Sequence, residues 1–173
     1  GTLRLAHGLP SGLVFRTLLS FVFFGAEAFV PLGLSTLRGF SPTQAGLVLT
    51  GASLVWVLGS WTQARIDERY GPRTRRLRML AGMGLVTFGI AFMAVAVLTP
   101  ALPALLAAVG WAIGGFGMGL GYPTTSVLVL DQAAEGEEGY ISSAHNLMEN
   151  IGIALGAGMG GAVFGLARSA DFT

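Results

Sequence analysis

The sequence predicts an all-α integral membrane protein, and three observations support this fold class. Hydrophobic residues make up 53% of the 173 residues, whereas charged residues make up 11%, about half the share usual in globular proteins. Mean hydropathy is +0.69. Two runs, 39–64 and 79–130, contain no charged residue. Since a bilayer core takes about 20 apolar residues of helix, the second run is long enough for two crossings.

The same composition excludes several classes of protein. So few charges do not suit a disordered chain, a nucleic-acid-binding module or a typical soluble enzyme. The chain has no cysteine, which rules out disulfide scaffolds and thiolate metal sites, and two histidines are few for a histidine-based one. No nucleophile and base stand at a suitable spacing. We therefore expect no enzyme activity, no metal, no cofactor and no nucleic-acid partner.

Five transmembrane helices account for the apolar segments. The first is apolar from Thr17 to Leu37 apart from Glu27, and the second lies within 39–64. Two prolines at 100 and 103 separate the third from the fourth, because proline removes a helix donor and favours a turn. An uncharged run at 150–167, extended upstream by an amphipathic stretch, forms the fifth. The predicted helices lie near 13–37, 42–64, 77–98, 103–130 and 141–167.

The arginines predict the orientation of these helices. All ten basic residues are arginine, and six of them lie between Arg65 and Arg78, in the loop after the second helix. A cluster of this kind stays in the cytoplasm. The chain is thus expected to be a multi-pass protein of the cell membrane, with the lipid bilayer as its first partner.

Glu27 is the most informative polar residue. It stands eleven positions after Arg16 and eleven before Arg38, which is about 16 Å along a helix from either. An ionised carboxylate at that depth costs at least ~2.5 kcal/mol, so it should face a cavity or a partner. We interpret Glu27 as a proton-coupling or substrate-binding carboxylate. The alternative is a protonated acid that only packs against a neighbouring helix. Pro31 loosens the helix beside it, since it gives no hydrogen bond to the Glu27 carbonyl.

The first third of the fifth helix is polar. Ser142, Asn146 and Glu149 share one face, and His145 neighbours Glu149. We interpret this stretch as a helix end at the level of the lipid headgroups, the alternative being a water-lined face at the cytoplasmic mouth.

Glycine is concentrated in the last two helices. Gly152, Gly156 and Gly160 follow one another at four-residue steps, the spacing at which membrane helices pack closely. We predict an interhelical contact along these three residues. A second series of glycines runs from Gly114 to Gly121, just before Tyr122 and Pro123.

These features together resemble the C-terminal half of a major facilitator superfamily transporter of the actinobacterial drug:proton antiporter kind. The loop motif of that family reads Gly-x-x-x-Asp-Arg-x-Gly-x-Arg. Here Arg69, Gly71 and Arg73 match it, with Ala64 in place of the first glycine and Glu68 in place of the aspartate. The stretches 25–31, 59–61 and 117–123 also look like this group. The resemblance covers essentially the whole chain.

The resemblance implies helices seven to eleven of the family fold, with residues 1–173 as a partial C-terminal half-domain that lacks its sixth helix. The missing N-terminal half and sixth helix would then be partners, and the chain a fragment of a longer protein. It further implies roles for particular residues. Glu27 would exchange protons or bind substrate, and the cavity would be lined by Pro31, Gly117, Gly121, Tyr122 and Pro123. The loop residues Glu68, Arg69, Gly71 and Arg73 would form a cytoplasmic latch, while the glycines of the fifth helix would meet the other half.

The function implied is proton-coupled efflux of small amphipathic molecules, with protons and a small-molecule substrate as further partners. Two alternatives stay open. One is a facilitator or importer of another small solute, in which Glu27 binds substrate. The other is a non-transporting membrane scaffold that holds a partner through its glycine-rich surface.

Overall fold

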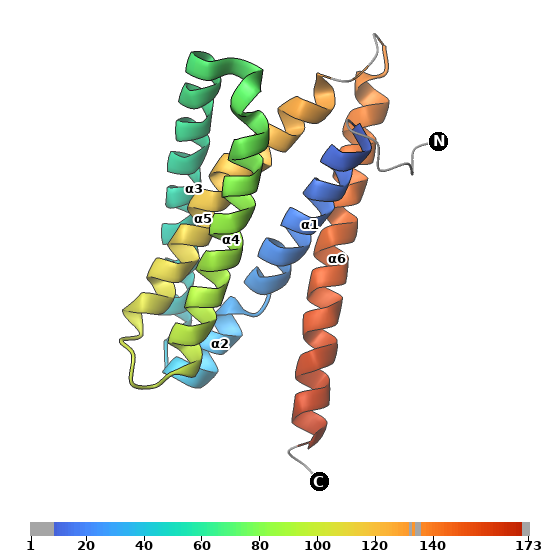
Figure 1. The fold of residues 1–173 in the computed structure, drawn as a ribbon. Coiled ribbons are helices and arrows are strands. Elements are labelled where there is room, and N and C mark those ends of the chain that lie inside the picture. The colour runs from blue at the N-terminus through green and yellow to red at the C-terminus, as the bar shows by residue number, and fades with distance from the viewer. Residues whose placement is uncertain (1–8, 132, 134–135, 171–173) are drawn as a thin grey trace.

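The computed structural model describes residues 9–131, 133 and 136–170, and the described chain is all-helical (Figure 1). In chain order the elements are α1 (Leu9–Glu27), α2 (Val30–Arg38), α3 (Pro42–Tyr70), the short 3-10 helix η1 (Gly71–Thr74), α4 (Arg75–Leu98), α5 (Leu105–Leu130) and α6 (Glu138–Ala170).

Four stretches of the described chain are long and apolar enough to cross a membrane. They are Ser11–Arg38, Pro42–Leu98, Leu105–Leu130 and Glu138–Leu166. The sequence predicts five crossing helices, whereas the structure has four such stretches. The difference arises at Pro42–Leu98, a stretch of 57 residues that includes both α3 and α4 and the turn η1 between them.

The first predicted helix, 13–37, is two helices in the structure. α1 ends at Glu27 and α2 begins at Val30, with a turn at Ala28 and Phe29 between them. Pro31 lies in the first turn of α2 and has no N–H for the Glu27 carbonyl. The Phe29 N–H instead donates to the Ala26 carbonyl at 2.9 Å, which tightens the chain into a turn. Glu27 is therefore the last residue of a helix and does not stand in the middle of one.

Local sequence explains the turn from α2 into α3. Gly39 adopts a left-handed conformation (φ 69°), which glycine takes without strain, and its N–H donates to the Leu34 carbonyl. Ser41 then caps α3. Its hydroxyl accepts from the Gln44 N–H at 3.3 Å, and the Gln44 side chain accepts from the Ser41 N–H at 2.8 Å. Arg38 ties this end to the turn before α5 by donating to the carbonyls of Thr99 and Leu102.

α5 packs against both α3 and α4, and it also contacts α1 (Figure 1). The backbones come close because glycines occupy the contacts. A Cβ atom on Gly115 would lie 2.6 Å from the Ala52 carbonyl oxygen in α3, and one on Gly117 would lie 2.7 Å from the Gly82 oxygen in α4. The α5 glycines therefore replace side-chain packing with backbone contact on two sides.

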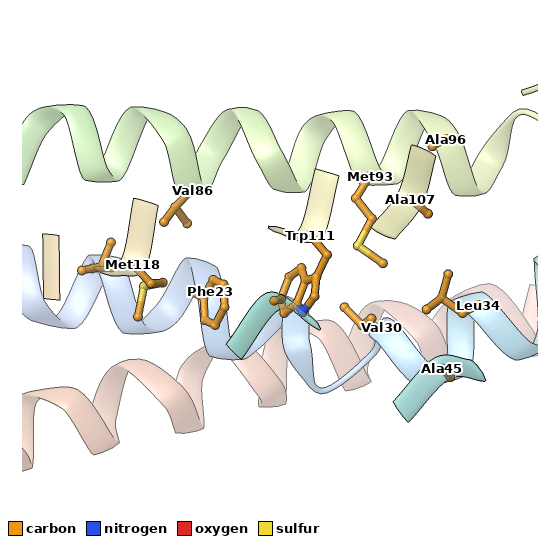
Figure 2. Packing of buried hydrophobic residues seen from close by; sticks show 12 residues of the cluster. Phe23, Val30, Leu34, Ala45, Val86, Met93, Ala96, Ala107, Trp111 and Met118 are labelled. Carbon is orange, nitrogen blue, oxygen red and sulfur yellow. The ribbon is translucent and has the colours of Figure 1, made fainter. Parts of the chain in front are cut away.

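The apolar core lies between α1, α2, α3, α4 and α5 (Figure 2). The Phe23 ring stacks on Trp111 with 4.7 Å between ring centroids. Val86 and Met118 lie on one side of this pair, and Val30 and Met93 lie on the other. The residues beside the break between α1 and α2 therefore pack against the middle of α4 and α5.

Candidate functional site

Glu27 lies at the C-terminal end of α1 and is half-buried. Among the described residues no side chain or backbone group makes a hydrogen bond or an ion pair with its carboxyl group. Its neighbours in α1 face the apolar core, since Phe23, one turn earlier, is 2% exposed. Glu27 is thus an acid beside an apolar core, at a point where the helix is interrupted.

A second polar site joins α1, α5 and α6, and it is built around Arg16. The Arg16 side chain is 2% exposed, although it lies within the apolar stretch Ser11–Arg38. Its Nη2 donates to Glu149 Oε2 at 2.7 Å. Its Nη1 donates to the Tyr122 carbonyl at 3.1 Å and to Thr125 Oγ1 at 3.2 Å. This buried cation is therefore neutralised by a carboxylate and bound to α5.

Tyr122 completes the arrangement around the ion pair. Its hydroxyl donates to Glu149 Oε1 at 2.7 Å, so both oxygens of this carboxylate are bound. The Arg16 Cζ atom lies 3.2 Å from the centroid of the Tyr122 ring, which is a cation–π contact. The Tyr122 ring also meets Trp56 of α3 edge-on, with 5.3 Å between centroids.

His145 and Ser126 continue the polar site toward the loop end of α6. His145 Nε2 and Ser126 Oγ are 3.3 Å apart. Three buried polar atoms around this junction have no hydrogen-bond partner among the described residues: Arg16 Nε, Ser20 Oγ and His145 Nδ1.

The structure adds a pair that the sequence did not predict. Arg16 is buried and paired about two turns inside α1. Glu149, which was interpreted as part of a helix end at the level of the lipid headgroups, forms the ion pair with Arg16 at 15% exposure. Sequence reasoning missed this pair because the partners are 133 residues apart. One signal in the sequence could have indicated the pair: Arg16 and Glu149 carry opposite charges, and each lies within an apolar stretch, where a charge needs a partner.

The residues that the resemblance assigns to a cavity do not form one cluster in the structure. Tyr122 belongs to the polar site. Gly117 contacts the α4 backbone, and a Cβ on Gly121 would lie 3.4 Å from the Leu19 side chain. Pro31 stands in the first turn of α2. Glu27 is about 16 Å along α1 from Arg16, so the structure does not bring it to the polar site.

The loop residues Glu68, Arg69, Gly71 and Arg73 lie at the turn between α3 and α4, where Gly71 adopts φ 61°. The ion pairs there involve their neighbours. Asp67 pairs with Arg75 and Arg78, and Arg75 also pairs with Asp131 at the end of α5. The hydrogen bonds from Arg75 and Arg78 hold the pKa of the Asp67 carboxyl below its usual value. Asp67 lies beyond the predicted crossing segment 42–64.

Gly152, Gly156 and Gly160 face α1 of the same chain. A Cβ on Gly156 would lie 2.5 Å from the Phe21 oxygen and 2.8 Å from Gly25 Cα. The resemblance places these glycines against another half of the protein, whereas in the structure α1 covers them. α1 supplies matching positions at four-residue spacing, Thr17, Phe21 and Gly25, and the turn after α1 continues the spacing with Phe29, whose ring lies against Gly160.

No group of three or more histidine, aspartate or glutamate side chains in the described residues could hold a metal ion. Within the part of the chain that the structure describes, the polar features that lie in apolar stretches of α1 and α6 are the carboxyl of Glu27, which has no partner there, and the buried pair of Arg16 and Glu149.

Comparison with known proteins relates the sequence of this chain to a family. A sequence model of the Major Facilitator Superfamily matches residues 3–157. Among curated proteins, the chain is 26% identical over 160 residues to the multidrug efflux pump SdrM of Staphylococcus aureus. It is 27% identical over 153 residues to the multidrug transporter protein MdtP of Bacillus subtilis. It is 28% identical over 164 residues to the probable actinorhodin transporter of Streptomyces coelicolor.

These matches include most of this chain but only part of each relative. They span 89%, 88% and 93% of the chain, and 33%, 27% and 27% of the three relatives in the same order. The chain therefore corresponds to about a quarter to a third of the curated relatives that it matches.

Proposed function

This chain belongs to the Major Facilitator Superfamily, and on that premise we propose that it forms part of a proton-coupled exporter of small amphipathic molecules. It is a multi-pass protein of the cell membrane, and its family consists of transporters and not of enzymes. The names of its relatives, a multidrug efflux pump and a multidrug transporter among them, favour efflux over uptake.

In this proposal the chain crosses the membrane five times, as helices seven to eleven of the family fold. Its N-terminal half and sixth helix would come from other parts of the transporter. The support is the length of Pro42–Leu98: its 57 residues are nearly three times the about 20 that one crossing needs, which leaves room for two crossings and the turn between them. η1 interrupts it beside six arginines, and such a loop stays in the cytoplasm.

Glu27 is the carboxylate that exchanges protons in this proposal, and one observation carries the assignment. Both oxygens of Glu149 are held by Arg16 and Tyr122, whereas the Glu27 carboxyl group has no partner among the described residues. An acid inside a membrane protein that is not tied to a cation can take up and release a proton without first breaking an ion pair. The break between α1 and α2 also leaves the backbone beside it free to adjust.

Replacement of Glu27 by glutamine tests the assignment, because glutamine keeps the shape of the side chain and removes its titration. The full-length protein would be reconstituted in liposomes, and export of a fluorescent lipophilic cation would be driven by an imposed pH gradient. We expect Glu27→Gln to lower export to the rate of protein-free liposomes. The matched control is Glu138→Gln, an exposed acid at the start of α6, which should export like the wild type.

Three other outcomes would point elsewhere. Unchanged pH-driven export in Glu27→Gln would remove Glu27 from the proton pathway. Wild-type transport that follows the substrate gradient and ignores the pH gradient would favour a facilitator or an importer. Absence of any transport by the folded wild type, across a panel of solutes, would favour the scaffold alternative.

A further inference from the structure

Four exposed arginines at the turn between α3 and α4 have no ion-pair partner (Figure 1). Of the six arginines in 65–78, Arg75 and Arg78 pair with Asp67, and Arg75 also pairs with Asp131. The stretch contains only two acids, so it keeps four positive charges in excess. Among the described residues no ion pair reaches the other four arginines, which are Arg65, Arg69, Arg73 and Arg76. These four guanidinium groups are available to an anionic partner.

Two of these arginines lie against exposed aromatic rings. The Arg65 Cζ atom is 4.5 Å from the centroid of the Trp61 ring, and the Arg69 Cζ atom is 5.5 Å from that of the Tyr70 ring. Trp61 is 57% exposed and Tyr70 is 55% exposed. Exposed tryptophan and tyrosine in membrane proteins gather at the level of the lipid headgroups, because each ring is apolar and carries one polar group. We therefore expect these arginines to lie at headgroup level.

An open apolar groove of about 320 Å³ lies beside these arginines, between α3 and α4. Tyr70, whose ring Arg69 contacts, forms part of its wall, and so does Thr74, the residue after Arg73. The rest of its lining includes Ile66, Leu77, Ala81 and Leu120. The groove thus offers an apolar surface to a hydrocarbon chain directly next to two unpaired positive charges.

We propose that this groove and the arginines beside it bind one anionic phospholipid. Its phosphate lies on Arg69 and Arg73, and one acyl chain lies along Leu77 and Ala81. A guanidinium group binds a phosphate through two parallel N–H groups, and Arg69 can do so at its edge while its face stays on Tyr70. The arginine cluster is predicted to face the cytoplasm, and the cytoplasmic leaflet is the one that carries anionic lipids.

The resemblance gives Arg69 and Arg73 a different role, as a latch against another part of the transporter. A phospholipid is favoured because it supplies both an anionic group for the arginines and a chain for the groove, whereas an acidic protein segment matches the arginines alone. Leu77 and Leu80 at this end of α4 are also 69% and 55% exposed, as side chains in contact with acyl chains are. The proposal requires that the chain lies in a bilayer, and it is independent of Glu27.

Phosphatidylglycerol and phosphatidylcholine with the same photoreactive diazirine in one acyl chain are suitable probes, since they differ in headgroup charge. The full-length protein would be reconstituted in phosphatidylcholine liposomes that contain a small fraction of either probe, and irradiated. Mass spectrometry would measure labelling of residues 77–81. We expect the phosphatidylglycerol probe to label them about fivefold more than the phosphatidylcholine probe, the effect of one arginine near an anionic headgroup. Both leaflets contain the probe, so the orientation of the protein does not matter.

Two double variants remove the same charge from different places. Arg69→Gln with Arg73→Gln removes the proposed headgroup contacts, and we expect the ratio of labelling by the two probes to fall to about one. The matched control is Arg65→Gln with Arg76→Gln, which should keep most of the ratio. Arg76 stands about 140° around α4 from Ala81, a residue of the groove, so it faces away from the proposed lipid.

A second pair of variants addresses the acyl chain. Ala81→Phe keeps every arginine and fills the groove from α4, and we expect it to lower the ratio to about one. The matched control is Ala91→Phe, which adds the same ring at another exposed position of α4. It should label like the wild type. Thermal unfolding would establish that each variant is folded.

Each outcome decides the proposal. A ratio that falls in Arg69→Gln with Arg73→Gln and in Ala81→Phe, and stays high in their controls, supports the lipid site. An equal fall in both arginine variants would show attraction to the whole cluster and overturn it. Absence of labelling by either probe would show that protein covers the groove, as a latch requires, and would overturn it too. If the arginine variant does not fold, Ala81→Phe and its control decide alone. Labelling needs no transport, so failure here is distinct from failure of the proposed function.

Discussion

At the scale of single residues, the ion pair of Arg16 and Glu149 is the most demanding feature of this chain. Each charge would be costly alone in an apolar stretch, and their attraction offsets that cost with the help of further hydrogen bonds from Tyr122 to Glu149 and from Arg16 to Thr125. Removal of one partner should therefore destabilise the protein strongly, whereas removal of both should have little effect on its stability.

This difference gives a prediction about stability. Glu149→Leu leaves the Arg16 guanidinium buried and unpaired, and we expect the protein to lose about 3–5 kcal/mol of stability. Arg16→Met combined with Glu149→Leu should recover most of that loss, since apolar residues of similar volume replace a buried pair at little cost. Thermal unfolding of the single and double variants in detergent measures both values. A double variant no more stable than Glu149→Leu would contradict this account.

At the scale of elements, the helices of this chain touch backbone to backbone. The glycines of α5 face α3 and α4, and those of α6 face α1, so each contact depends on the absence of a side chain. Other glycines of α6, among them Gly158 and Gly161, meet nothing within 4 Å and carry no such constraint. The same substitution should therefore have opposite effects on stability at two neighbouring glycines of one helix.

Gly156 and Gly158 in α6 form a matched pair for this test. A Cβ at position 156 would lie 2.5 Å from the Phe21 oxygen, while one at position 158 would meet nothing within 4 Å. Gly156→Ala should destabilise the α1–α6 contact by about 1–3 kcal/mol, as overpacking does. Gly158→Ala should be neutral or stabilising by up to about 1 kcal/mol, because alanine favours a helix. Thermal unfolding would compare them, and equal effects would show that α6 does not pack on α1 as described.

At the scale of the whole molecule, the proposed five crossings predict which loops face each side of the membrane. This chain has no cysteine of its own, so single cysteines report without background from it. Arg73→Cys lies in the turn between α3 and α4, and Ala101→Cys lies in the turn before α5. We expect an impermeant maleimide to label Ala101→Cys in intact cells, and Arg73→Cys only after the membrane is opened. Labelling of both from outside would refute the proposed topology.

The charges at the turn between α3 and α4 were predicted from the sequence only in part. The cluster of arginines predicted a loop that stays in the cytoplasm. Which of them would pair could not be read from the sequence, because Asp67, Arg75 and Asp131 come together only when α5 ends beside the start of α4. The motif residues Glu68, Arg69 and Arg73 flank the pairs that the structure contains.

The sequence by itself determined the class of the protein, its apolar stretches and the weak point beside Pro31. These properties depend on composition and on local chemistry, which act within a few residues. The tertiary structure decided that Arg16 and Glu149 neutralise each other while Glu27 has no partner among the described residues, and that Gly152 and Gly156 of α6 meet α1. It also decided that the Trp111 ring is buried against Phe23. Contacts of this kind join residues far apart in the chain, so the packing of helices, and not the order of residues, selects them.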